Sequence, residues 1–281
     1  AKRRKALADF ESLRAEQNVH SKLVSTAPKD EKANLVAEAG ALSAKVKTAN
    51  ELAGSAAEEL DRIIWQIENV VLEGVPAGGE ADYVVIKEVG NKTAFNFEPK
   101  DHVALGESLD VIDMERGAKI SGSRFYFLKG MGARLELALM NLALDKATKA
   151  GFTALITPTL VRPEIMAGTG FLGEHADEIY YLPADDLYLT GTSEVALAGY
   201  HRDEIIDLGK EPLRYAGWST CYRREAGSHG KDTRGILRVH QFNKLEMFSY
   251  CLPELAEQEH QKLLAFQEEM LQACELPYRV I

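Results

Sequence analysis

Two charged runs, joined by a polar loop, carry side chains that suit a phosphate-bearing ligand. They span residues 220–225 and 238–246. Side chains two residues apart share one face of a strand, so Arg223 and Glu225 project together. On the second run, one face carries Arg238, His240, Phe242, Lys244 and Glu246.

The residue types on this face indicate a polyanion that also carries a ring and an amine. Fixed guanidinium groups suit phosphate oxygens. Phe242 offers a stacking surface for a base, and the Glu246 carboxylate could pair with an ammonium group. The loop at 226–235 is rich in glycine and basic residues and could close over a ligand or contact RNA. A solvated sheet edge is the structural alternative.

Other motifs carry less information. The glycines at 168, 170 and 173 fit GxGxxG, but that dinucleotide fingerprint needs a strand before it and a helix after it. Pro158 and Pro163 interrupt the approach, so we expect a loop with turn glycines. The histidines are scattered and no cysteines lie at ligand spacing, so no protein metal site is predicted. No Ser-His-Asp triad candidate is present.

The charged runs need a sheet to position them. Strands are predicted at 214–224 and 235–250 because both alternate in polarity, and the loop between them predicts an antiparallel hairpin. A further strand at 152–157 ends at Pro158, and another begins at Tyr278.

Two helices are expected beside these strands. The helix at 131–150 is apolar almost all round, which predicts burial, and Gly151 closes it. The helix at 253–274 is amphipathic and has proline near its first turn.

Residues 1–68 predict two antiparallel helices with a turn at 25–30. The second helix has a coiled-coil seam in steps of four and three: Leu35, Ala39, Leu42, Val46, Ala49, Ala53, Ala56, Leu60, Ile63 and Ile67. The first has a weaker one: Ala6, Phe10, Leu13, Gln17, His20 and Val24. Any two-helix hairpin could pack in this way, but the small alanines make a thin seam, so we expect the hairpin to project into solvent.

Composition excludes several classes of protein. The 281 residues are 46% hydrophobic with a net charge of −10, which argues against a general nucleic-acid coat. Residues 1–68 hold eleven basic and eleven acidic side chains, so any RNA contact must be a local patch. No apolar run approaches the ~20 residues that cross a bilayer, so no membrane association is predicted.

The two ends of the chain predict a piece of a longer protein. It opens at Ala1 without Met, in a helical pattern, and stops at Ile281 just after a strand begins. No apolar stretch follows the basic residues 2–5, so they do not predict a signal peptide. Three cysteines without CxxC spacing favour a reduced, cytoplasmic protein.

The charged runs resemble motif 2 of the class II aminoacyl-tRNA synthetases in its seryl form. The matching letters are R-R-E at 223–225, the basic loop, R-V-H-Q-F at 238–242 and K-L-E at 244–246. A lone R-x-E would be weak evidence, but further elements match in order.

Those elements extend the resemblance along the chain. Residues 149–158 resemble motif 1, whose proline lies at the family's dimer interface, and T-G-T-S-E at 190–194 resembles its serine-binding loop. The resemblance implies an α+β fold: a class II antiparallel β-sheet flanked by helices, with an N-terminal two-helix coiled-coil arm. It divides the chain into a tRNA-binding arm at 1–68, a linker at 69–82 and a catalytic domain at 83–281, incomplete at its C-terminus.

The resemblance also implies roles for single residues. Arg223 would hold the ATP α-phosphate and Phe242 would stack on adenine. The catalytic group would be Arg223, Glu225 and Arg238. ATP, with accompanying Mg²⁺, would bind Arg223, Arg224, Glu225, Val239 and Phe242. Serine would bind Thr192, Ser193, Glu194, Arg223 and Glu246.

The implied activity is that of a seryl-tRNA synthetase, a homodimer that converts L-serine and ATP to seryl-adenylate and pyrophosphate and then passes the seryl group to tRNA(Ser) held by the arm. Family members continue with a glutamate-serine segment, another serine contact and the motif 3 arginine, which this sequence does not contain. Two alternatives remain: a catalytically silent paralogue acting as a binding module, and an amino acid:carrier protein ligase. A nicotinamide oxidoreductase is least favoured.

Overall fold

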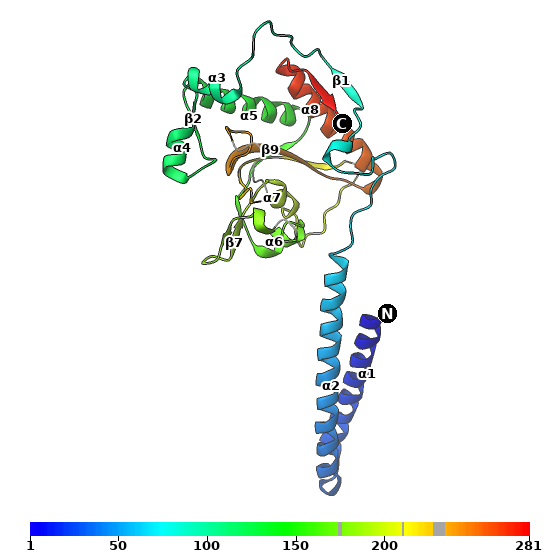
Figure 1. Ribbon diagram of the computed structural model, residues 1–281. Coiled ribbons are helices and arrows are strands. Elements are labelled where there is room, and N and C mark those ends of the chain that lie inside the picture. The colour runs from blue at the N-terminus through cyan, green and yellow to red at the C-terminus, as the bar shows by residue number, and fades with distance from the viewer. Residues whose placement is uncertain (174–175, 210, 227–233) are drawn as a thin grey trace. The chain divides into compact units, whose positions relative to one another are not determined.

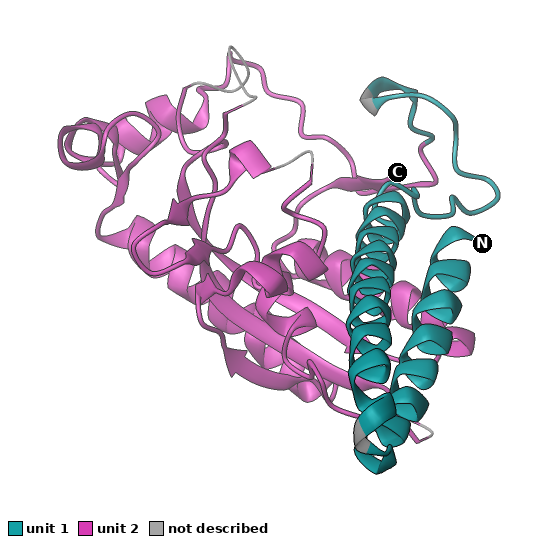
Figure 2. Cartoon of the chain, turned by 90° about the horizontal axis from the view of Figure 1, so that it is seen from below, with its two compact units in different colours: residues 1–84 teal, residues 85–281 magenta. Residues whose placement is uncertain are grey.

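The computed structural model describes residues 1–173, 176–209, 211–226 and 234–281 (Figure 1). It divides into two compact units, Ala1–Val84 and Val85–Ile281, coloured separately in Figure 2. Each unit has its own packing and is described by itself.

The first unit is a pair of long helices, α1 (Lys2–Thr26) and α2 (Lys29–Ile64). They are antiparallel, because Lys2 near the start of α1 pairs with Glu59, whereas His20 near its end pairs with Glu38. The predicted hairpin is therefore confirmed.

The seam between these helices follows the predicted heptad positions. Leu42, Ala49 and Ala56 are buried at seven-residue intervals, as knobs of a coiled coil are. Every predicted seam position of α1 is half-buried. Leu60 and Ile63 differ, because they lie towards the end of α2 and are 36% and 45% exposed. The prediction is wrong for Ile67, which lies beyond the end of α2 and is 72% exposed.

The second unit is built on a three-stranded sheet in the order β4-β8-β9. Strands β8 (Leu213–Tyr222) and β9 (Gln241–Tyr250) form the predicted antiparallel hairpin. On the other side of β8, β4 (Thr153–Ile156) pairs in parallel, an arrangement the sequence did not predict.

The hairpin is shorter than predicted at its loop end. The ladder ends with the Tyr222–Gln241 pair, so four predicted residues lie beyond it: Arg223, Glu225, Arg238 and His240. The expected alternation of faces does not reach these four residues. Glu225 has a left-handed backbone (φ 51°), which turns the chain out of the strand.

The two faces of the sheet carry different side chains. Figure 1 shows α5 (Met131–Lys149) and α8 (Ala256–Ala273) on one side of β9, and α6 (Pro163–Gly168) and α7 (Glu194–Ala198) on the other. The first side holds a core of Ala147, Phe152 and Ala216, packed with Leu144, Leu245, Met247, Leu263 and Phe266. The second side has its own core beyond the sheet, of Val161, Met166, Ile179 and Val195.

Helix α5 has the predicted span, and Gly151 follows it with a left-handed φ of 89°. The prediction that it would be buried all round is wrong. Leu135, Leu137 and Leu139 are 58%, 54% and 40% exposed. A sheet covers only one side of a helix, and no other described element covers the opposite side.

A buried ion pair ties α8 to the hairpin. Arg214 donates two hydrogen bonds of 2.7 Å to the Glu259 carboxylate, which also accepts from Ser249 and Lys262. The Glu259 side chain is 5% exposed. The Arg214 bonds, then those of Lys262 and Ser249, lower the pKa of Glu259 to about 2, so the carboxyl stays charged inside the fold.

Shorter elements complete the second unit. The predicted strand at Tyr278 is β10 (Tyr278–Val280), antiparallel to β1. The GxGxxG segment begins at Gly168, the last residue of α6, and continues as turns, and a helix rather than a strand leads into it. The expected loop is therefore confirmed from residue 169 onward. The remaining elements are β1 (Lys87–Val89), α3 (His102–Ser108), β2 (Ile112–Asp113), α4 (Met114–Ser121), β3 (Phe127–Leu128), β5 (Leu160–Val161), η2 (Ala176–Glu178), β6 (Tyr181–Leu182), β7 (Leu187–Leu189), η3 (Pro253–Leu255) and, in the first unit, η1 (Glu80–Asp82).

Candidate active site

The candidate site lies where three segments meet at the loop end of the β8–β9 hairpin. The end of β8 is tied to the segment after β7, because the Tyr222 amide donates to the Thr190 carbonyl at 2.9 Å. That segment continues through Gly191 into α7. Residues 178–180 form the third side, because the Arg224 amide donates to the Glu178 carbonyl at 2.8 Å.

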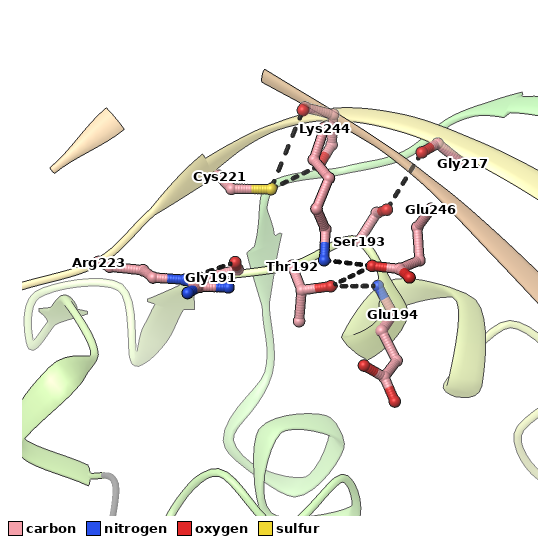
Figure 3. A network of polar contacts seen from close by, with 10 residues as sticks. Gly191, Thr192, Ser193, Glu194, Gly217, Cys221, Arg223, Lys244 and Glu246 are labelled. Atoms are coloured by element: carbon pink, nitrogen blue, oxygen red, sulfur yellow. Dashed lines mark hydrogen bonds and ion pairs between the residues drawn. The ribbon is translucent and has the colours of Figure 1, made fainter. Parts of the chain in front are cut away.

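A buried hydroxyl orients the Glu246 carboxylate. Thr192, 4% exposed, donates its hydroxyl hydrogen bond to Glu246 Oε2 at 2.8 Å and accepts one from the Glu194 amide at 3.2 Å (Figure 3). The Lys244 ammonium pairs with the same Oε2. Glu246 therefore pairs with an alkylammonium group of its own chain in this structure, and its binding of a ligand's ammonium group stays a prediction.

The other two predicted residues of this loop lie differently. Ser193 is fully buried, and its hydroxyl donates to the Gly217 carbonyl at 3.1 Å. Its single proton is used inside the fold, so this side chain fastens the loop to β8. The Glu194 side chain is exposed, and Figure 3 shows its carboxylate pointing away from Glu246.

Arg223 lies against the only aromatic ring predicted for the site. Its guanidinium carbon is 5.2 Å from the centre of the Phe242 ring, and its Nε donates to the Gly191 carbonyl at 3.3 Å. The backbone of Arg223 is bonded to His240, whose Nδ1 donates to the Arg223 carbonyl at 2.9 Å. An exposed guanidinium next to an aromatic face can pair with a phosphate while a base stacks nearby.

The remaining charged residues form a second group. Arg238 Nη1 lies 3.4 Å from Glu225 Oε2. The Arg224 guanidinium is 5.9 Å from the centre of the Tyr180 ring. Val239, which was predicted to line the nucleotide pocket, is 5% exposed.

The structure thus brings together Thr192 with Glu246, Arg223 with Phe242, and Glu225 with Arg238. Sequence reasoning missed Glu178, whose carboxylate accepts from the Ala226 amide at 3.0 Å, and Tyr180. No spacing connects these two residues to the charged runs, so the sequence held no signal for them.

The described residues show neither a metal cluster nor a membrane helix. Among them, no group of three His, Cys, Asp or Glu side chains is placed to hold a metal ion. In the same residues, no helix combines the length and the apolar character that crossing a membrane requires.

Two family models match the chain. Residues 1–71 match the seryl-tRNA synthetase N-terminal domain, and residues 181–281 match the class II tRNA synthetase core domain for G, H, P, S and T. The serine–tRNA ligase of Nocardia farcinica is 60% identical over the whole chain, which covers 67% of that protein. The chain belongs to the seryl-tRNA synthetase family.

Other seryl-tRNA synthetases are also similar to nearly the whole of this chain, in sequence and in structure. The serine–tRNA ligase of Leifsonia xyli subsp. xyli is 67% identical over 99% of the chain, which spans 66% of that relative's length. The crystal structure of the seryl-tRNA synthetase from Pyrococcus horikoshii complexed with ATP superimposes with a TM-score of 0.87 at 35% identity, covering 99% of this chain and 67% of that one. These matches confirm the predicted family and fold.

Proposed function

We propose that the protein activates L-serine with ATP and transfers the seryl group to tRNA(Ser). The observation that carries this proposal is the Glu246 carboxylate, oriented by the buried Thr192 hydroxyl and already paired with an ammonium group. A carboxylate placed in this way suits the amine of an amino acid.

In the first step, the serine carboxylate attacks the α-phosphorus of ATP and pyrophosphate leaves. The attacking group is itself a nucleophile, so the site has only to position it and to balance charge on the phosphate. We assign Arg223 to the α-phosphate, assisted by Arg224, Glu225 and Arg238. Phe242 stacks on adenine, with Val239 behind the same pocket.

Serine binds on the α7 side of this arrangement. Glu246 accepts its ammonium group once Lys244 moves aside, and Thr192 and Ser193 hold the loop in place. Glu194 borders the site, and Arg223 bridges the serine carboxylate to the phosphate. A site that hydrogen-bonds the serine hydroxyl strongly rejects an amino acid without one.

Mg²⁺ is proposed to arrive with ATP. The ion commonly binds through substrate phosphates and one or two carboxylates. The described residues offer no preformed set of three ligands, so we assign no residue to the ion and no step to it.

The arm is proposed to hold tRNA(Ser). RNA helices are recognised mainly by shape and backbone, and α1 carries a local set of basic residues: Lys2, Arg3, Arg4, Lys5, Arg14 and Lys22. We accordingly divide the chain into an arm at 1–68, a linker at 69–82 and a catalytic domain at 83–281.

A homodimer is proposed through the motif 1 region. Ile156 is 91% exposed and, together with Pro158, lines a largely apolar groove of about 380 Å³. A contiguous exposed apolar surface, unlike a single exposed side chain, is typical of an interaction site. Sedimentation of the wild-type protein tests this point, and a monomer at micromolar concentration would contradict it.

The protein is also proposed to work in the cytoplasm. Its three cysteines are unpaired, and Cys221 is buried, which fits a reducing compartment.

Serine-dependent ATP–pyrophosphate exchange tests the activity, measured on the longest natural reading frame that contains this chain. We expect exchange with serine alone. If no amino acid supports exchange, the result would instead favour the silent paralogue. Exchange followed by loading of a carrier protein, but not of tRNA, would favour the carrier ligase.

A further inference from the structure

Helix α7 is attached to the sheet at both of its ends. At its start, Thr192 and Ser193 bond to Glu246 and to the Gly217 carbonyl. At its end, the Tyr250 hydroxyl lies 2.6 Å from the Leu197 carbonyl oxygen and 3.0 Å from that of Ala198. A phenol has one proton to donate, so the two carbonyls share it.

The attachments through Glu246 and Tyr250 come from one face of β9. Glu246 and Tyr250 are four residues apart on a continuous strand, and side chains at even spacing point to the same side. The last carbonyls of a helix have no partner within it. The Leu197 carbonyl accepts from the Tyr200 amide at 3.1 Å, and Tyr250 adds a second donor that comes from the sheet.

The space between these attachments is filled closely. Gly217 lies opposite Glu246 in the ladder, and a Cβ there would come within 2.9 Å of a Leu197 methyl group and 3.2 Å of the Ser193 hydroxyl. The five-residue helix thus rests directly on the backbone of β8. Any tilt of α7 about this contact moves Thr192 relative to Glu246.

The Tyr250 ring is itself held in place. It packs edge-on against His201 and Phe248, with ring centres 5.2 and 5.1 Å away. Burial raises the pKa of the Tyr250 phenol, so the hydroxyl keeps its proton and remains a donor. The His201 imidazole is bonded elsewhere, because its Nε2 lies 2.7 Å from the Tyr215 hydroxyl and its Nδ1 2.7 Å from Glu204, whereas the His201 backbone bonds the Tyr250 oxygen.

We propose that Tyr250 is a positioning residue for the amino-acid site: by fixing the end of α7, it sets where Thr192 meets Glu246. This inference rests on the proposed function, because it assigns the Thr192–Glu246 pair to serine. Tyr250 touches no substrate. It acts through α7, whose displacement would misalign the group that receives the serine amine, and small misplacements are costly in a preorganised site.

The test is Tyr250→Phe, which removes the hydroxyl and keeps the ring, in the longest natural reading frame that contains the chain. We expect the KM for serine in pyrophosphate exchange to rise about two- to tenfold, the range set by one hydrogen bond. The KM for ATP should not change, because the described contacts of Arg223 and Arg224 are made with Phe242, Gly191 and Tyr180, outside α7.

Tyr215→Phe is the matched control, because it removes a phenol hydroxyl from the same aromatic cluster that binds His201 and not α7. Both variants should lose similar thermal stability, but only Tyr250→Phe should raise the KM for serine. Equal effects of the two variants on that KM, or no effect of Tyr250→Phe, would overturn the proposal.

Hydrogen exchange provides a readout that does not depend on activity. The Leu197 amide, bonded to the Ser193 carbonyl at 2.9 Å, should exchange faster in Tyr250→Phe than in Tyr215→Phe. Unchanged protection would overturn the attachment itself. A wild-type protein without serine-dependent exchange would overturn the proposed function, whereas an active wild type with an unaffected Tyr250→Phe variant would overturn only the role of Tyr250.

Discussion

The arm and the amino-acid site are stabilised in opposite ways. The arm repeats one apolar contact along its length, with Leu42, Ala49 and Ala56 buried a heptad apart. The site depends on single polar contacts, each made once, such as that of Thr192 with Glu246 across 54 residues of sequence. When one contact of a repeated seam is lost, the neighbouring contacts stay in place. When one contact of the site is lost, no other contact replaces it.

The largest expected effect concerns Glu246. Glu246→Ala should reduce serine-dependent pyrophosphate exchange about a thousandfold or more, because the ammonium group loses its charged partner. Glu246→Gln tests the charge alone, because glutamine keeps the size of glutamate and an acceptor for Thr192. This variant should recover little activity. Near-normal exchange in Glu246→Ala would contradict the assignment of this residue.

Removing the arm should separate the two steps of the reaction. Deletion of residues 1–68 is expected to leave serine activation intact, because the two units pack separately, and to reduce tRNA aminoacylation about a hundredfold, as loss of several phosphate contacts would. Both rates are measured on the same preparation. An equal loss of both would mean that the arm has no separate RNA-binding role.

Acid should weaken the second unit through Glu259. Its pKa in the folded protein is about 2, below its ordinary value of 4.5. The stabilisation is therefore fully present above pH 4.5 and is lost as the pH falls towards 2, amounting to about 3 kcal/mol at most. Glu259→Gln should make the free energy of unfolding of this unit less dependent on pH over that range. An unchanged pH dependence would exclude the pair with Arg214 as its cause.

The smallest expected effect lies in the seam of the arm. Leu42→Ala should cost about 2–3 kcal/mol of arm stability, because a buried leucine leaves a cavity. Pyrophosphate exchange should not change. Leu52→Ala, at a position 59% exposed, is the control and should cost under about 0.5 kcal/mol. Loss of exchange in Leu42→Ala would break the contrast between the two regions.

Much of this architecture follows from short-range patterns. The heptad spacing placed the seam of the arm, and alternation placed the β8–β9 hairpin with Phe242, Lys244 and Glu246 on one face. Such features depend only on how neighbouring residues project from a helix or a strand, so the sequence determined them by itself.

Tertiary structure decided what the periodic patterns do not contain. It brought Thr192 to Glu246, placed Glu178 and Tyr180 beside the second charged run, and turned the Ser193 hydroxyl into the fold. It also left one side of α5 exposed, against the prediction from its leucines. These outcomes depend on the path of the chain between distant segments and on how much of each surface a neighbour covers, and no local spacing records either.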